Sequence, residues 1–130
     1  MILIDTSAWV EFLRATDTSA DQSVQAALVG DIATCDPVRM ELLAGAHSDR
    51  NVGGLRRLLS RAVHLPTHPS DYDDAALLYR RARASGFTVR RLVDCLIAVI
   101  AIRHDVPVLH ADRDFTALAE CSTLRALERP

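Results

Sequence analysis

The sequence predicts a three-layer α/β/α fold in which helices cover a central parallel sheet of four to five strands. Short apolar runs such as residues 1–4 and 32–35 alternate with stretches of helical length, the pattern of a sheet covered on both faces. Residues 92–102, LVDCLIAVIAI, are apolar on every face except at Asp94, which is typical of a helix in the middle of a domain. The 130 residues are 49% hydrophobic and 25% charged, so we expect residues 1–130 to form one globular domain.

Hydrophobic periodicity and capping residues predict the order of the elements. The predicted strands are residues 1–4, 32–35, 63–65 and 106–110, followed by a last apolar stretch near 123–127. The predicted helices are residues 6–14, 23–29, 36–44, an apolar stripe over 55–63, and residues 70–85, 92–102 and 115–120.

Two helix starts carry specific signals. Asp36 is the expected N-cap of its helix, with Pro37 in the first turn. Ser70 is expected to begin the clearest helix, with Asp73 at capping-box spacing. The core stripe predicted for this second helix is Tyr72, Ala75, Ala76, Tyr79 and Ala82.

Charge and cysteine content narrow the functional classes. The net charge of −2 gives no general attraction to nucleic acid or membranes, so an anionic substrate needs a local basic patch or a metal. The three cysteines include no CxxC pair, and the first residues do not resemble a secretory signal. We therefore expect reduced thiols in a cytoplasmic protein. The apolar run of 92–102 is too short to cross a membrane.

Acidic residues follow two of the predicted strands. Asp5 comes directly after the first strand, and Asp112 and Asp114 come just after residues 106–110. Ligands of open parallel sheets bind outside the carboxyl ends of the strands, so these acids are expected at one rim. The alternative is that each of them only caps the following helix.

Two further acids lie within predicted helices. Glu41 shares a helix face with small and apolar residues, which suggests a half-buried side chain; the alternative is an ordinary surface glutamate. Asp94 shares its face with Ile97, Ala98 and Ala101. The alternative for Asp94 is stabilisation by the helix macrodipole, worth about 0.3–1 kcal/mol. That is less than the several kcal/mol that an unpaired buried charge costs, so the alternative requires a carboxylate that reaches solvent.

Taken together, the acids suggest a metal site. Convergence of Asp5, Glu41, Asp94 and Asp112 would create like-charge pairs that each cost roughly 3 kcal/mol at about 5 Å and an effective dielectric near 20. Such a cluster either holds protons at neutral pH or binds a hard cation. Ligands that are all oxygen atoms suit Mg²⁺ or Mn²⁺ rather than zinc, and a hard dication suits phosphodiester chemistry.

Several arginines lie next to these acids in the sequence. They are candidates for binding RNA phosphates, although each alone is equally compatible with a solvated surface side chain. The four candidates are Arg39, Arg90, Arg91 and Arg113.

Four segments in order resemble the PIN-domain family. They are ILIDTSA (2–8), MELLAG (40–45), VDCLIA (93–98) and VLHADRDF (108–115). Each is weak alone, but the ordered set is specific and spans nearly the whole chain. The compact size also resembles the VapC toxins of VapBC toxin–antitoxin pairs.

The resemblance implies a PIN-like fold and a Mg²⁺- or Mn²⁺-dependent endoribonuclease. Asp5, Glu41, Asp94 and Asp112 match the family's acidic quartet, and Asp114 matches a frequent fifth acid. The resemblance also implies a homodimer and a VapB-type antitoxin whose tail enters the acidic groove. One departure is Ala111, where many members carry a hydroxyl residue that supports the aspartate.

The resulting hypothesis is RNA cleavage by a metal-activated water. Asp5, Asp94 and Asp112 would face the metal, Glu41 would act as a ligand or orient the water, and Asp114 would support a second metal or the nucleophile. A rival is an RNA- or protein-binding PIN-like domain without cleavage activity, but four acids would repel the phosphates that such a domain binds. A second rival is an aspartate-nucleophile phosphatase, which usually has a second Asp where this chain has Ser7.

Overall fold

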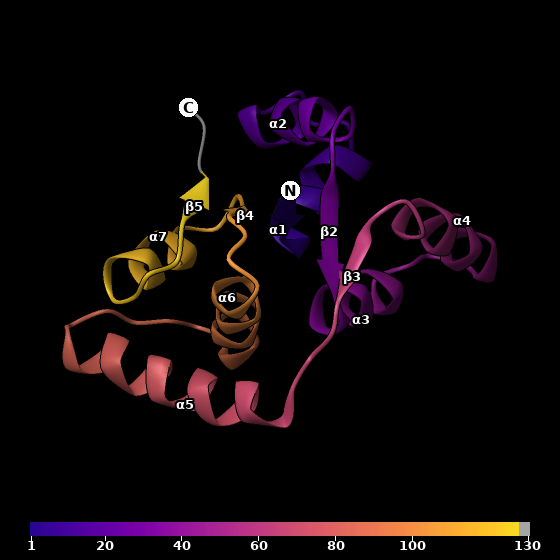
Figure 1. Ribbon diagram of the computed structural model, residues 1–130. Coiled ribbons are helices and arrows are strands. Elements are labelled where there is room, and N and C mark those ends of the chain that lie inside the picture. Colours follow the sequence, from indigo (N-terminus) through magenta and orange to yellow (C-terminus); the bar gives the residue numbers. More distant parts are fainter. Residues whose placement is uncertain (128–130) are drawn as a thin grey trace.

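A computed structural model describes residues 1–127 of the chain. Its strands are β1 (Ile2–Ile4), β2 (Ile32–Cys35), β3 (Val63–Leu65), β4 (Val108–Leu109) and β5 (Ala126–Leu127). Its helices are α1 (Thr6–Leu13), α2 (Ser19–Ala27), α3 (Asp36–Ala44), α4 (Asp49–Leu59), α5 (Pro69–Ala84), α6 (Leu92–Arg103) and α7 (Arg113–Glu120) (Figure 1). None of the helices in this part of the chain has the length and hydropathy needed to cross a bilayer.

The described strands form one parallel sheet in the order β3-β2-β1-β4-β5. The order reverses between β1 and β4, because the chain first moves outward to β3 and then returns to the other side of β1. Right-handed crossovers therefore place α1 and α2 on one face and α5 to α7 on the other. The helix contacts agree, since α5, α6 and α7 pack on one another and α1 packs on α2, whereas α3 contacts both α1 and α6. The predicted α/β fold with four to five parallel strands is confirmed.

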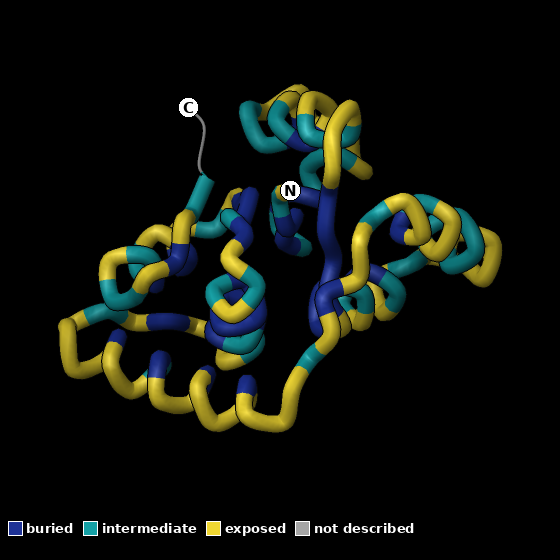
Figure 2. Tube along the Cα trace, viewed as in Figure 1, coloured by how far each residue is buried: buried dark blue, intermediate teal, exposed yellow. Residues whose placement is uncertain are grey.

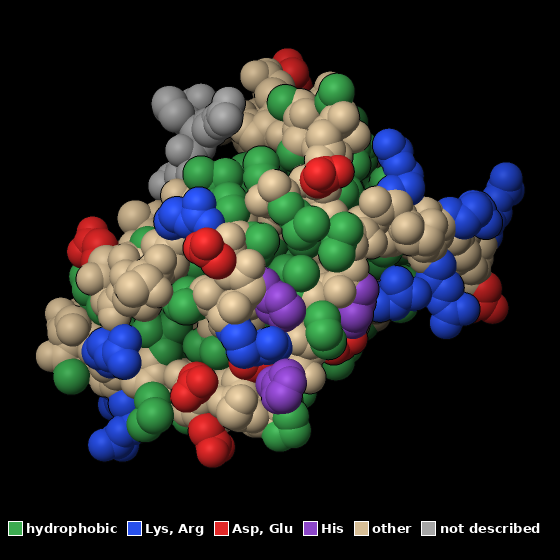
Figure 3. Space-filling model, viewed as in Figure 1, with side chains coloured by type: hydrophobic (Ala, Val, Ile, Leu, Met, Phe, Trp, Pro, Cys, Tyr) green, Lys and Arg blue, Asp and Glu red, His purple; other side chains and the backbone are tan. Residues whose placement is uncertain are grey.

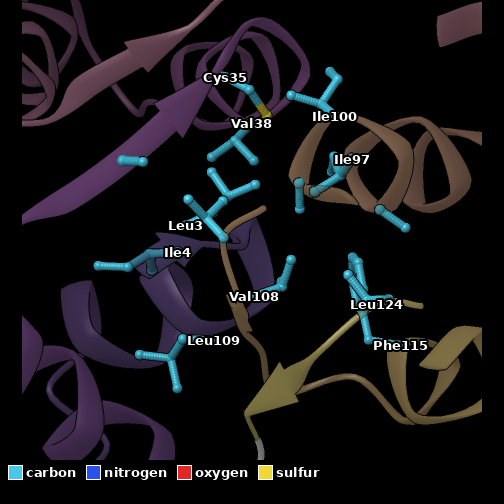
Figure 4. Packing of buried hydrophobic residues seen from close by; sticks show 14 of the residues in the cluster. Leu3, Ile4, Cys35, Val38, Ile97, Ile100, Val108, Leu109, Phe115 and Leu124 are labelled. Carbon is cyan, nitrogen blue, oxygen red and sulfur yellow. The ribbon is translucent and has the colours of Figure 1, made fainter. Parts of the chain in front are cut away.

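One part of the core lies between the sheet and the central helix α6, and another part, with Trp9, belongs to the side of α1 and α2. Figure 4 shows Ile97 and Ile100 of α6 facing Leu3 of β1 and Val108 of β4. All four of these side chains are fully buried, and each contributes about 1.5–3 kcal/mol through removal from water. Figure 2 shows the same contrast along the trace, with α6 largely buried and the outer side of α5 exposed. The prediction of a helix in the middle of the domain is therefore confirmed for α6.

Helix α5 differs from its prediction in start and in face. Its N-cap is His68, not Ser70, because Pro69 occupies the first helical position and Asp71 accepts a hydrogen bond from the His68 amide at 2.8 Å. The buried stripe is Asp71, Ala75, Leu78 and Ala82, with Tyr79 partly buried. Tyr72 and Ala76 of the predicted stripe are exposed.

An ion pair explains that rotation of the helix. Asp71 is fully buried and accepts hydrogen bonds from Nε and Nη2 of Arg103, both at 2.8 Å. The Arg103 guanidinium also donates to the Pro66 carbonyl at 2.6 Å. The pair fixes the start of α5 against the end of α6, and it holds the pKa of Asp71 below its usual range.

Three smaller differences concern element boundaries. Helix α2 begins at Ser19, earlier than predicted, because the Thr18 side chain caps it. Asp36 is the first residue of α3 rather than its cap, and its side chain instead accepts from Thr67 at 2.7 Å. Val63 belongs to β3 and is half exposed, so it does not continue the apolar stripe of α4.

Candidate active site

Asp5 lies at the carboxyl end of β1 and caps α1. Its Oδ2 accepts hydrogen bonds from the amide and the hydroxyl of Ser7. Ser7 Oγ in turn accepts from the Ala111 amide at 2.9 Å, which ties the end of β1 to the segment after β4. Asp5 is fully buried, and its Oδ1 has no hydrogen-bond partner among the described residues. Burial raises the pKa of Asp5 above its ordinary value. Capping therefore accounts for one carboxylate oxygen only.

Asp94 lies in the first turn of α6 and is also fully buried. Its Oδ1 accepts from Nη2 of Arg91 at 2.9 Å, whereas its Oδ2 is buried and has no partner within residues 1–127. Burial raises the pKa of Asp94 to about 7 despite the opposing charge of Arg91. The carboxylate does not reach solvent, so the helix macrodipole alone does not explain it.

The ends of β4 and α6 bring three carboxylates together. Asp112 is the N-cap of α7 and accepts from the Asp114 amide at 3.0 Å. One ligand oxygen from each of Asp94, Asp112 and Asp114 lies within 4.8 Å of the others, the only such group found in the described residues. Asp94 and Asp114 are buried and Asp112 is partly buried. This is the spacing at which one cation could contact all three oxygens.

Glu41 and Asp5 lie next to this group without belonging to it. Glu41 of α3 is largely buried, with a side chain 17% exposed, and accepts from the Thr6 hydroxyl at 2.8 Å. The negative charge of Glu41 contributes to the raised pKa of Asp5, and the charge of Asp5 contributes to that of Asp94. The five candidate acids thus share one electrostatic environment. The hypothesis from the sequence gave Asp114 only a supporting role, but Asp114 belongs to the group with Asp94 and Asp112.

Two adjacent arginines bridge the acids. Arg90 donates from Nη2 to Asp112 at 2.7 Å and from Nε to Asp114 at 3.1 Å. Arg91 donates from Nη1 to Glu41 and from Nη2 to Asp94, at 2.8 and 2.9 Å. Burial opposes the charged form of Arg91, but the carboxylates outweigh it and raise its pKa.

The other two candidate arginines are placed differently. Arg39 and Arg113 form no salt bridge within the described part of the chain. The sequence does not predict the pairing of Arg90 and Arg91 with the acids, or the roles of Thr6 and Ser7. A signal existed only for Arg91, which stands three residues before Asp94, the spacing of neighbours on a helix surface.

The residues present fit a hard divalent cation. The closest potential ligands are carboxylate oxygens only, and none of the grouped residues is a His or Cys. The unpartnered Oδ1 of Asp5 and Oδ2 of Asp94 are buried acceptors that a cation or a proton would satisfy. Mg²⁺ and Mn²⁺ are the ions that such oxygen sets suit.

A groove leads away from Glu41 between α1, α3 and α4. It encloses about 590 Å³. Its apolar wall includes Val10, Leu42 and Leu58, and basic side chains stand along it: Arg14, His47, Arg50 and Arg57. Figure 3 shows arginine side chains gathered over α4. A partner for this groove would combine apolar side chains with acidic ones.

Comparisons with known proteins agree with this arrangement. The PIN domain model matches residues 2–120. The chain is 45% identical over 130 residues to the ribonuclease VapC11 of Mycobacterium tuberculosis, with 97% of both chains covered. It is also similar to VapBC2 from Rickettsia felis bound to a DNA fragment from its promoter, with a TM-score of 0.74, 19% identity and 98% of each chain covered.

A further solved structure is the toxin VapC20 of Mycobacterium tuberculosis, described as cleaving the sarcin-ricin loop. Its TM-score is 0.71 at 16% identity, with 96% of this chain and 99% of that chain covered. The predicted resemblance to VapC ribonuclease toxins is thereby confirmed. The chain belongs to the PIN-domain family and, within it, to the VapC ribonucleases.

Proposed function

We propose that residues 1–130 act as a single PIN domain that hydrolyses RNA phosphodiester bonds with the help of Mg²⁺ or Mn²⁺. The observation that carries this proposal is the group of Asp94, Asp112 and Asp114 oxygens within 4.8 Å, beside two buried carboxylate oxygens without partners. When bound, the cation supplies a Lewis acid for the phosphate and lowers the pKa of water.

The chain's own residues would divide the remaining work. Asp94, Asp112 and Asp5 would hold the cation, and Asp114 would complete the set beside Asp112. Glu41 stands at the open side of the cluster, where its carboxylate can orient a water and accept its proton. Thr6 fixes the Glu41 carboxylate through its hydroxyl, so the proton acceptor is held in place before substrate binds.

Cleavage is favoured over simple RNA binding by charge. Five acids gather at the rim, and a phosphate approaching them without a cation would be repelled. The arginines would counter that repulsion at the edges of the site. Arg39 and Arg113 have no acidic partner among residues 1–127, so they can bind RNA phosphates directly.

We further propose that the chain is a toxin that a VapB-type antitoxin neutralises. The groove from Glu41 along α4 joins an apolar wall to a basic rim, which suits an acidic amphipathic segment whose end reaches the carboxylates. A homodimer and a cytoplasmic location belong to the same proposal. The cysteines are all free thiols, in keeping with a reducing compartment.

The decisive experiment compares RNA cleavage by the wild type, Asp94→Asn and Asp73→Asn. Asp73 is an exposed acid of α5, so its substitution makes the same chemical change away from the site. We expect Asp94→Asn to lower the cleavage rate in Mg²⁺ by about 100-fold or more with an unchanged circular dichroism spectrum, and Asp73→Asn to cleave normally. Full cleavage by Asp94→Asn, or undiminished wild-type cleavage in excess EDTA, would refute the proposal.

A further inference from the structure

Arg90 and Arg91 together form salt bridges with four of the five acids of the site. Arg90 bridges Asp112 and Asp114, and Arg91 bridges Glu41 and Asp94. The two arginines are adjacent in sequence and immediately precede α6. Their guanidinium groups reach the carboxylates from a single short segment, with N–O distances of 2.7 to 3.1 Å.

These bridges involve the same carboxylate side chains that a cation would use. Asp94, Asp112 and Asp114, whose oxygens lie within 4.8 Å of one another, are each hydrogen-bonded to one of the arginines. Asp94 and Asp114 are buried, whereas the arginine side chains are 57% and 46% exposed. The carboxylates are therefore fixed by the fold, and the guanidinium groups have open space into which they can move.

We propose that Arg90 and Arg91 form a built-in cationic placeholder, which holds the acidic site together without metal and is displaced when a divalent cation binds. This inference rests on the proposed metal-dependent function. Without any cation the buried carboxylates would repel one another, and the two guanidinium groups supply the missing positive charge. A dication at the three grouped oxygens would repel the guanidinium groups and compete with them for the same carboxylates. Metal binding and arginine release are thus one exchange of cations.

The exchange makes the arginines weaken metal binding. Replacing Arg91 removes one positive charge from the site. The electrostatic repulsion that is removed is twice as large for a dication as for a proton. The net effect of Arg91→Gln is therefore tighter metal binding. The same reasoning applies to Arg90→Gln.

The first test measures the Kd of Mn²⁺ from the electron paramagnetic resonance signal of the free ion at pH 8.0. We expect Arg90→Gln and Arg91→Gln each to bind Mn²⁺ about 5- to 20-fold more tightly than the wild type. Arg113→Gln is the matched control, because Arg113 lies between two of the acids in sequence yet forms no salt bridge in residues 1–127. Its Kd should change by less than about threefold.

The second test observes the displacement in the unmutated protein. The Nε–H group of Arg90 donates to Asp114, and that of Arg103 donates to Asp71 at the opposite end of α6. In a ¹⁵N NMR titration with Mg²⁺, the Arg90 Nε–H signal should shift and lose its protection from solvent exchange. The Arg103 signal should stay unchanged in the same spectrum.

The outcomes separate this inference from the proposed function. Tighter Mn²⁺ binding in both variants, with a Mg²⁺-dependent Arg90 signal, supports the placeholder. Equal Mn²⁺ affinity in the wild type and both variants, or an Arg90 signal that is unaffected at saturating Mg²⁺, overturns the placeholder and leaves metal-dependent cleavage standing. Failure of millimolar Mn²⁺ to bind any of these proteins refutes the metal-dependent function itself.

Discussion

Replacing Asp94 by Asn should stabilise the protein at alkaline pH while removing its activity. Burial raises the pKa of Asp94 from 3.8 to about 7, which corresponds to about 4 kcal/mol of differential interaction between its two protonation states. Between these pH values the native state keeps a proton that the unfolded chain has released. The free energy of unfolding contributed by this group therefore falls as the pH rises from about 4 to 7.

Asn has the shape of protonated Asp and never ionises. We therefore expect Asp94→Asn and the wild type to agree within about 1 kcal/mol at pH 5.0, and the variant to be about 2–4 kcal/mol more stable at pH 8.0. Urea unfolding in EDTA, followed by circular dichroism at both pH values, measures the difference. At saturating Mg²⁺ about 100-fold above its Kd, the wild type alone should regain about 2.7 kcal/mol.

Two results would contradict the expected stability of Asp94→Asn. A variant that is less stable than the wild type at pH 8.0 would show that the Asp94 charge is compensated in the native state. A stability difference that is the same at both pH values would show that packing, not ionisation, separates the two proteins. Either result would remove the basis for treating Asp94 as a group held ready for a cation.

Three further predictions follow from other parts of the structure. Arg103→Ala should lower the free energy of unfolding at pH 7 by about 2–4 kcal/mol in urea denaturation. Because the pKa of Asp71 is lowered, the difference in stability between wild type and variant should narrow as the pH falls below 4. A difference independent of pH would contradict this. Ser7→Ala removes the hydroxyl hydrogen bond that lowers the pKa of Asp5, so the pH at which Mg²⁺-dependent cleavage is half-maximal should rise, and an unchanged pH profile would argue against Asp5 as a site residue. Native protein at pH 8 should react with iodoacetamide first at Cys121, which is partly exposed, because burial raises the pKa of the Cys95 thiol to about 11 and that of the Cys35 thiol to about 12. Mass spectrometry of the peptides measures the order, and earlier labelling of Cys95 or Cys35 would contradict the prediction.

The sequence predicts most of what depends on hydrophobic pattern. The eleven apolar residues around Asp94 identify α6 as the central helix, and the runs at 2–4 and 32–35 identify two inner strands. The rim follows from the same pattern, because acids placed directly after parallel strands must meet at the carboxyl edge. The sequence alone therefore predicts that Asp5 and Asp112 lie at one rim.

What the sequence does not predict is decided by side-chain partners distant in the chain. The packed face of α5 is rotated from the predicted one, although it keeps Ala75, Tyr79 and Ala82, because Asp71 is buried by its pairing with Arg103, 32 residues later. Apart from the i, i+3 spacing of Arg91 and Asp94, the bridges from Arg90 and Arg91 depend on rotamers and on the closeness of α3, α6 and α7, which no local spacing encodes. Polar groups become core residues only when their partners arrive, so periodicity alone misplaces them.

The apolar composition of α6 offsets the unfavourable free energy of burying the Asp94 carboxylate. An ionised Asp94 disfavours folding by about 4 kcal/mol at neutral to alkaline pH, which is a large fraction of the stability of an ordinary domain. Ile97 and Ile100 are both fully buried against the sheet, and two such side chains contribute about 3–6 kcal/mol. A helix with one polar face would lack this contribution to stability. The uninterrupted apolar sequence thus lets the first turn of α6 hold a carboxylate away from water, where it can meet a cation without first losing a hydration shell.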